Sequence, residues 1–138
     1  MVEKLMMEED AYRLLRSAGV PVPASALAET REQAAEFASR IGFPVVLKIV
    51  SPDVIHKSDV GGVVLGVATH EEAARAFDTI RENVKSHLPG ARFEGVLVVA
   101  QAARGMELII GGRTDDSFGK VLTFGLGGTL VEFLDDVV

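Results

Sequence analysis

Several residue types that support particular chemistries are missing or rare in this chain. Its 138 residues include no cysteine, no tryptophan and one tyrosine. The lack of cysteine excludes disulfides, thiolate metal sites and a cysteine nucleophile, and it suits a reducing cytoplasm. Basic residues are outnumbered by acidic ones, 14 to 20, which gives a net charge of −6. No basic field is therefore present for a nucleic-acid backbone, and we expect no nucleic-acid partner.

Long apolar runs are also missing. The longest, such as residues 96–100, have the length of a strand and are too short to cross a bilayer. The N-terminal MVEKLMMEED carries acidic residues where a signal peptide needs an apolar core, so we expect neither a targeting segment nor a membrane partner. A composition that is 48% hydrophobic and 25% charged is typical of one globular domain or part of a larger one.

Helices are expected where apolar residues recur at spacings of three and four. The first spans residues 8–18. Two others begin at Thr30 and Thr69, where a glutamine or glutamate three residues later completes a capping box. In the first helix this spacing is formed by Ala11, Leu14, Leu15 and Ala18. The expected buried face of the third consists of Ala73, Ala76, Phe77, Ile80 and Val84.

Strands are expected at residues 45–50, 63–68, 95–101, 106–112, 120–124 and 130–134. The order of the elements after the second helix predicts an α+β fold, a compact sheet with helices on one face. The later strands predict a hairpin whose loose polar turn spans residues 113–119.

Lys48 is a charged residue inside an otherwise apolar strand. Alternation along the strand places it on the same face as Val46 and Val50. Removing an ammonium group from water is costly unless an anion meets it, so one interpretation is a phosphate-binding lysine. The other is a lysine that faces solvent on a half-exposed sheet.

His56 begins the polar segment His-Lys-Ser-Asp-Val-Gly-Gly between two expected strands. An imidazole nitrogen can act as a nucleophile or a proton carrier. The backbone N–H groups of Gly61 and Gly62 could approach a phosphate without obstruction by side chains. The alternative is a solvated histidine with local hydrogen bonds, and for His70 and His87 we expect a surface position.

Further candidates lie in the last third of the chain. Glu107 adjoins an apolar run, where it is either a charge at the edge of a sheet or a contact to ribose or metal. The Gly125–Gly128 segment predicts either a tight connection or a nest of amides that faces phosphate. It is not a P-loop, because no Lys-Ser or Lys-Thr follows. The acidic pairs 115–116 and 135–136 are typical of solvated turns, and no spacing matches a preformed metal site.

Together these motifs resemble one family. They are, in order, Leu47-Lys48, residues 56–63, residues 106–111, Phe118-Gly119 and residues 124–128. This order resembles the ATP-grasp part of nucleoside-diphosphate-forming acyl-CoA synthetases, which include the β subunit of ADP-forming acetate–CoA ligase and are related to succinyl-CoA synthetase β. The resemblance implies an ATP-grasp fold with nucleotide in the cleft. The implied parts are an N-terminal helix and linker at 1–22, a small lobe at 23–102 and the beginning of a large lobe at 103–138.

The resemblance also implies roles for individual residues. His56 would accept a phosphoryl group and relay it between ATP or ADP and a CoA-binding subunit or domain. The strand around residues 98–101 would form the adenine hinge through backbone groups, because Val99 and Ala100 stand where family members often have glutamine or glutamate. The implied nucleotide-binding residues are Lys48, Gly61, Gly62, Val99, Gln101, Glu107, Gly127 and Gly128.

The implied cofactors are ATP/ADP and Mg²⁺, and the implied reaction is acyl-CoA + ADP + phosphate ⇌ acid + ATP + CoA. The acid, the acyl-CoA and phosphate would reach the protein through the CoA-binding partner. The family takes its Mg²⁺ ligands from a region beyond residue 138, so we expect this chain alone to be catalytically incomplete. The alternative is a non-catalytic regulatory ATP-grasp module of the kind fused to protein acetyltransferases, and a third option is a fragment that self-associates as a homo-oligomer.

Overall fold

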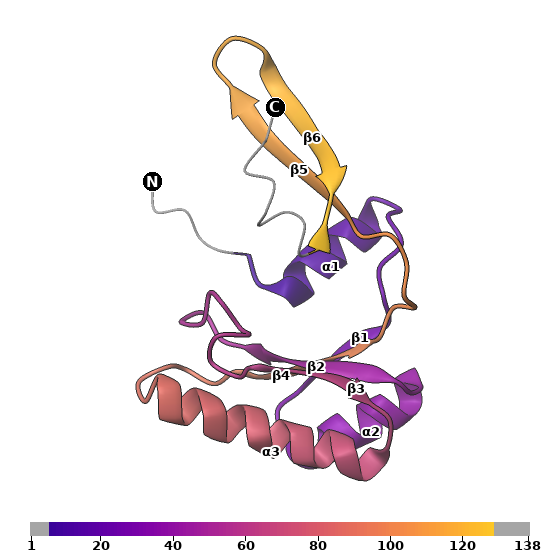
Figure 1. Ribbon diagram of the computed structural model, residues 1–138, viewed down its shortest axis with the longest axis vertical. Helices are drawn as coiled ribbons and strands as arrows, with labels where there is room; N and C mark the ends of the chain where they lie inside the picture. Colours follow the sequence, from indigo (N-terminus) through magenta and orange to yellow (C-terminus); the bar gives the residue numbers. More distant parts are fainter. Residues whose placement is uncertain (1–5, 129–138) are drawn as a thin grey trace. The chain divides into compact units, whose positions relative to one another are not determined.

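The computed structural model describes residues 6–128, which form two compact units, one up to Ala102 and one from Ala103 (Figure 1). Unit 1 contains α1 (Glu8–Ser17), β1 (Ser25–Ala28), α2 (Arg31–Ile41), β2 (Val45–Val50), β3 (Val63–Val67), α3 (His70–His87) and β4 (Gly95–Ala100). Unit 2 contains β5 (Leu108–Asp115) and β6 (Gly119–Leu126). The predicted α+β fold is confirmed. The strand expected at 130–134 and the acidic pair 135–136 lie outside the described residues.

Unit 1 is built on a four-stranded antiparallel sheet in the order β1-β4-β2-β3. Strand β4 is an inner strand, paired with β2 from Val45↔Ala100 to Val50↔Gly95. Its other edge pairs with β1, which the sequence did not predict. Ser-Ala-Leu-Ala lacks the β-branched residues and the alternation that mark a strand, so β1 is defined by its pairing with β4.

One face of the sheet is covered by α2 and α3 (Figure 1). The alternation predicted for β2 is confirmed on this face, where Val45, Leu47 and Ile49 are fully buried. All five residues expected to be buried in α3 are buried. Both helices begin as predicted, because the Thr30 and Thr69 hydroxyls accept hydrogen bonds from the third backbone N–H that follows each of them.

The opposite face of the sheet is covered in part by α1, so the prediction of helices on one face only was wrong. The apolar spacing that predicts α1 does not mark its packed side, since Leu14 and Leu15 are 58% and 40% exposed. Met7 and Tyr12 pack instead on this face. The physical reason is Lys48, which lies on this face of the sheet and needs an acceptor. The side of α1 that packs here therefore carries the Glu8 carboxylate as well as Tyr12.

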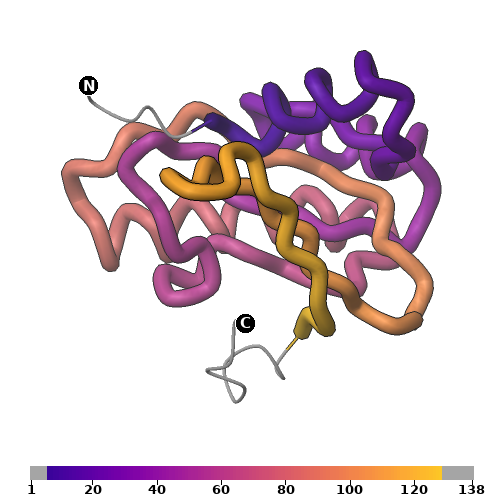
Figure 2. Tube along the Cα trace, turned by 90° about the horizontal axis from the view of Figure 1, so that it is seen from above, coloured from indigo at the N-terminus to yellow at the C-terminus, as the bar shows by residue number. Residues whose placement is uncertain are grey.

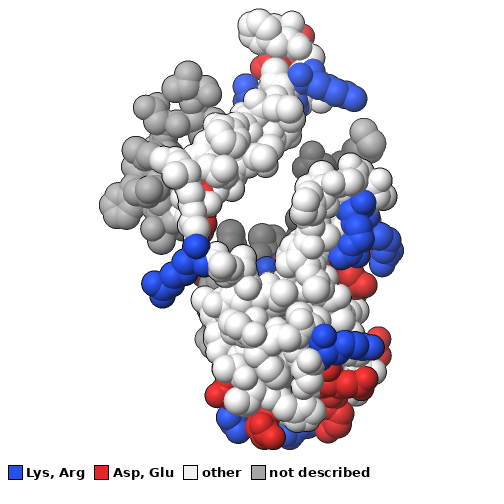
Figure 3. Space-filling view, turned by 90° about the vertical axis from the view of Figure 1, so that its right-hand side faces the viewer, with Lys and Arg blue, Asp and Glu red and all other residues white. Residues whose placement is uncertain are grey.

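Unit 2 is an antiparallel hairpin, in register from Leu108↔Leu126 to Asp115↔Gly119. Its turn is shorter than the seven residues predicted, because the Asp115 carboxylate accepts from the backbone N–H groups of Ser117 and Phe118 and closes it. The hairpin surface visible in Figure 3 is largely free of charge below the tip. One face presents apolar side chains that are 50–83% exposed: Leu108, Ile110, Leu122, Phe124 and Leu126. Among residues 6–128, no helix is long and apolar enough to cross a membrane.

Candidate functional site

Lys48 is the first predicted site residue, and it does not face open solvent. Its ammonium donates to Oε1 of Glu8, the first residue of α1, at 2.6 Å. The Tyr12 hydroxyl donates to the same oxygen at 2.9 Å, and Nζ of Lys57 lies 3.7 Å from Oε2. These four residues are called the Glu8 cluster below. The anion that meets Lys48 in this structure is therefore a carboxylate of the chain itself.

Sequence reasoning missed Glu8 and noted only that the N-terminus is acidic. A local signal was present, since Glu8 and Tyr12 are separated by one helical turn and can meet on one side of α1. Partial burial raises the pKa of Glu8, but the hydrogen bond and charge of Lys48, the Tyr12 hydroxyl and the charge of Lys57 outweigh it and leave that pKa below its ordinary value. Burial and the bonded carboxylate raise the pKa of Tyr12 to about 12. The carboxylate is accordingly ionised at neutral pH.

His56 lies in the loop of residues 51–62 between β2 and β3, called the histidine loop below, and its side chain is exposed. Figure 2 shows this loop leaving the end of β2 and returning into β3. One end is held by Asp53, whose carboxylate accepts from the backbone N, Nε and Nη2 of Arg92 at 2.9, 3.0 and 3.1 Å. These hydrogen bonds lower the pKa of Asp53 to about 2. Val54 is buried at the same end.

Gly61 and Gly62 close the other end of the histidine loop. We expected their backbone N–H groups to face a phosphate, but in this structure they donate within the loop, to the carbonyls of Ser58 at 3.0 Å and Lys57 at 2.7 Å. Both positions require glycine. Gly61 has a φ of +62°, and a Cβ at Gly62 would lie 2.5 Å from Ile49 Cγ2. The glycines thus fix the path of the loop, and their contact with nucleotide stays a prediction.

Val99 and Gln101 lie at the predicted adenine hinge. Val99 is buried in β4 and pairs with Val46, which places it on the face of the sheet that carries Lys48. Gln101 follows β4, and its side-chain oxygen accepts from the backbone N–H of Gly66 at 2.7 Å. The side chain of Gln101 therefore links the ends of β3 and β4. The backbone N–H groups of Ala100 and Gln101 donate to the carbonyls of Ala24 and Pro44, so the adenine hinge stays a prediction.

Unit 2 brings three predicted site residues together. The Gly127 N–H donates to the carbonyl of Glu107 at 2.8 Å. A Cβ at Gly128, where φ is +74°, would lie 2.9 Å from Oε2 of Glu107, so the carboxylate rests against glycine backbone. Glu107 precedes β5 instead of lying inside the strand. Residues 6–128 contain no group of three or more His, Asp or Glu side chains arranged to hold a metal.

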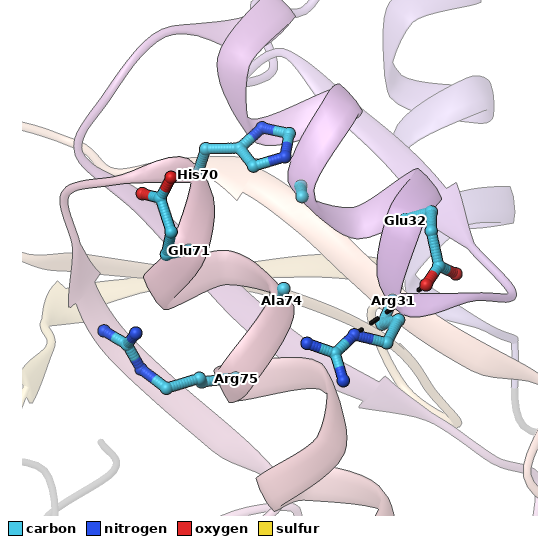
Figure 4. Close-up of a pocket in the computed structure, with 7 residues that line it drawn as sticks. Arg31, Glu32, His70, Glu71, Ala74 and Arg75 are labelled. Atoms are coloured by element: carbon cyan, nitrogen blue, oxygen red, sulfur yellow. Dashed lines mark ion pairs between the residues drawn. The ribbon is translucent and has the colours of Figure 1, made fainter.

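A cavity of about 410 Å³ lies between α2 and α3, and it contains none of the predicted site residues (Figure 4). It is lined by basic and acidic side chains together, including Arg31, Glu32, His70, Glu71 and Arg75. Arg31 is already paired with Asp78 at 2.8 Å. The cavity lies on the side of the sheet covered by α2 and α3, opposite the face that carries Lys48.

Unit 1 thus holds a partly buried lysine and an exposed loop histidine, and in unit 2 Gly127 and Gly128 contact Glu107. The chain belongs to the ATP-grasp domain family, which matches residues 2–138. It is 44% identical over 132 residues to the β subunit of ADP-forming acetate–CoA ligase I of Pyrococcus furiosus, an alignment that covers 96% of this chain and 57% of the relative. It is 43% identical to the ADP-forming 4-hydroxybutyrate–CoA ligase of Nitrosopumilus maritimus, covering 96% of this chain and 19% of that protein.

Solved structures agree with this assignment. Acetyl-coenzyme A synthetase 1 of Ca. Korarchaeum cryptofilum, in complex with coenzyme A and Ca-AMPCP, matches with a TM-score of 0.92 and 48% identity, over 98% of this chain and 59% of that chain. Another structure of that protein contains Mg-AMPPCP, and its phosphohistidine segment points towards the nucleotide-binding site. It matches with a TM-score of 0.79 and 43% identity, over 97% of this chain and 55% of that chain. The chain thus spans little more than half the length of its β-subunit relative, and the predicted family is confirmed.

Proposed function

We propose that this chain is the nucleotide-binding part of an ADP-forming acyl-CoA synthetase of the acetyl-CoA type, and that His56 relays the phosphoryl group. The observation that carries the proposal is an exposed histidine on a loop with fixed ends, in the same unit as a lysine held on the face of the sheet. The relatives named as ADP-forming ligases support the reaction class. The phosphohistidine segment of the Korarchaeum enzyme supports a histidine as carrier.

In the proposed step an imidazole nitrogen of His56 attacks the γ-phosphorus of ATP. A nitrogen–phosphorus bond forms while the bond between the γ-phosphorus and the bridging oxygen breaks, and ADP leaves. The phosphohistidine then passes its group to the CoA-binding subunit or domain, and the reverse sequence makes ATP. Lys48 would supply positive charge to the phosphates. Mg²⁺, when bound, would neutralise phosphate charge, but the described residues offer no ligand set, so we derive no step through it.

The histidine loop suits a phosphoryl carrier because its ends are held by hydrogen bonds while its middle is exposed. Arg92 holds one end through Asp53, and the amides of Gly61 and Gly62 close the other. Between them, Ile55 and His56 are exposed. A loop with such anchors can present an imidazole to different partners while its attachment to the sheet stays the same.

The proposed partners are a CoA-binding subunit or domain and, through it, a small acid or its acyl-CoA and phosphate. We place the protein in the cytoplasm, where those metabolites occur. The relatives named above are ligases, which favours this reaction over a regulatory ATP-grasp module.

His56→Ala tests the proposal in the full-length gene product. Incubation with γ-labelled ATP and Mg²⁺ should label the wild-type protein with an acid-labile, alkali-stable phosphoryl group, and the variant should carry none. His70→Ala is the matched control, because His70 is also exposed in unit 1 but lies in α3. Labelling of the His56→Ala protein at the wild-type level would contradict the proposal.

A further inference from the structure

The carboxylate of Glu8 connects three segments that are far apart in the sequence. It belongs to the first turn of α1, it accepts from Lys48 on β2, and it faces Lys57 in the histidine loop. Lys57 directly follows His56. One carboxylate therefore lies between the lysine proposed to bind phosphate and the residue adjacent to the proposed phosphoryl carrier.

This cluster differs from the other ion pairs of α1. Glu9 and Asp10 pair with Arg13 along the helix surface at 3.7 and 3.3 Å, and the Arg13 side chain is 72% exposed. In contrast, the Glu8 and Lys48 side chains are 21% and 27% exposed and join different elements. Exposed pairs contribute little because water competes for both charges, whereas a partly buried pair constrains geometry.

The geometry points to Glu8 as a positioning residue of the phosphoryl-transfer site, one that holds Lys48 ready for nucleotide phosphate and keeps the histidine loop beside it through Lys57. This inference rests on the proposed function. Glu8 acts through the two lysines and touches neither nucleotide nor the reacting atoms.

The two arms of the cluster differ in strength. A lysine ammonium has three donors, and the 2.6 Å bond to Glu8 uses one of those of Lys48, so with respect to residues 6–128 two are left for phosphate oxygens. Lys57 lies at 3.7 Å, where the attraction is that of charge without a hydrogen bond. The hydrogen bond to Glu8 thus fixes the orientation of Lys48. The weaker attraction between Lys57 and Glu8 keeps the histidine loop nearby but can break when the loop moves with a phosphoryl group on His56.

Glu8→Gln tests the inference because the amide keeps the size of the side chain and removes its charge. We expect the N–H groups of Gly61 and Gly62, which close the histidine loop, to exchange hydrogen roughly fivefold faster in the variant. His56 should be phosphorylated by ATP about tenfold more slowly, because Lys48 and the loop are no longer aligned. Affinity for ADP with Mg²⁺ should be equal or up to about twofold higher, because a negative charge near the phosphates is gone.

This divergence between affinity and rate separates positioning from simple loss of structure, which would lower both. Glu9→Gln is the matched control, a neighbour on the same helix whose partner is Arg13, and it should leave all three measurements unchanged. Tyr12→Phe, which removes one donor to Glu8, should give a smaller effect in the same direction. Glu8→Asp should recover part of the transfer rate because the charge returns.

The outcomes distinguish this inference from the proposed function. If wild-type protein is phosphorylated on His56 and Glu8→Gln matches it in rate and in amide exchange, the inference is overturned while the function stands. If wild-type protein is not phosphorylated, the function fails. Faster amide exchange at Gly61 and Gly62 in Glu8→Gln would still support the proposal that Glu8 of α1 holds the histidine loop through Lys57, and unchanged exchange would refute it.

Discussion

The two units of the chain differ in how much of their apolar surface is buried. In unit 1 the strands β2 and β4 have side chains buried on both faces, and seven large apolar side chains are fully buried. In unit 2 the apolar side chains of one hairpin face are all at least half exposed. A two-stranded ribbon without a covered face is at best marginally stable by itself. Unit 1 therefore carries the stability of the described residues, and unit 2 offers an apolar surface.

This contrast indicates how each unit can hold functional groups. Lys48 and the histidine loop are fixed by packing, ion pairs and backbone hydrogen bonds inside unit 1. Within the described residues, Glu107, Gly127 and Gly128 contact one another and the backbone at the start of β5. Substitutions that compare like residues in the two units test this difference.

The largest difference is expected for large apolar side chains. Leu47→Ala should lower the free energy of unfolding by about 2–5 kcal/mol, because it leaves a cavity beneath α2 and α3. Ile110→Ala in the hairpin should cost less than about 0.5 kcal/mol, since Ile110 is 72% exposed. Urea unfolding of both variants measures the two values, and similar losses would show that the hairpin face is covered in the native protein.

A smaller effect is expected from adding a methyl group at glycine. At Gly62 the new Cβ would lie 2.5 Å from Ile49 Cγ2 and 2.9 Å from the carbonyl oxygen of Lys57, so Gly62→Ala should cost about 1–3 kcal/mol and distort the histidine loop. At Gly112 in the hairpin the nearest atoms are at 3.6 and 3.9 Å, an ordinary contact. Gly112→Ala is therefore the control and should be nearly neutral in thermal unfolding. A neutral Gly62→Ala would mean that the loop adjusts freely.

The smallest effect is expected for the exposed ion pair between Asp53 and Arg92 at the start of the histidine loop. Hydrogen bonds from Arg92 lower the pKa of Asp53 from 3.8 to about 2, so the pair contributes above pH 4 and is lost as the pH falls through 2. Arg92→Gln should raise this pKa part of the way back to 3.8, because the side-chain bonds are lost while the backbone N–H of residue 92 still donates, and carboxyl carbon NMR would show the change. Arg40→Gln, whose guanidinium lies over the Phe37 ring and not at Asp53, should leave it unchanged. A native pKa near 3.8 would mean that the two side chains do not pair in solution.

Most of the fold could be predicted from the sequence, because periodicity and caps act locally. Thr30 and Thr69 mark helix starts through bonds to residues only three positions away. Strand β1 could not be predicted, since its short run of small residues becomes a strand only through the edge of β4. The orientation of α1 was missed for a similar reason. Leu14 and Leu15 form a regular apolar stripe, yet the side of α1 that packs is the one that can satisfy Lys48.

The sequence by itself determined the family, the order of the elements apart from β1, and the placement of Lys48 on a strand and His56 on a loop, because motif order, alternation and capping are properties of neighbouring residues. Only the tertiary structure decided what Lys48 meets. Its partner Glu8 is 40 residues away in the chain. It also decided that the amides of Gly61 and Gly62 close the histidine loop. Pairings of this kind depend on which surfaces the packed sheet brings together, and no local pattern encodes them.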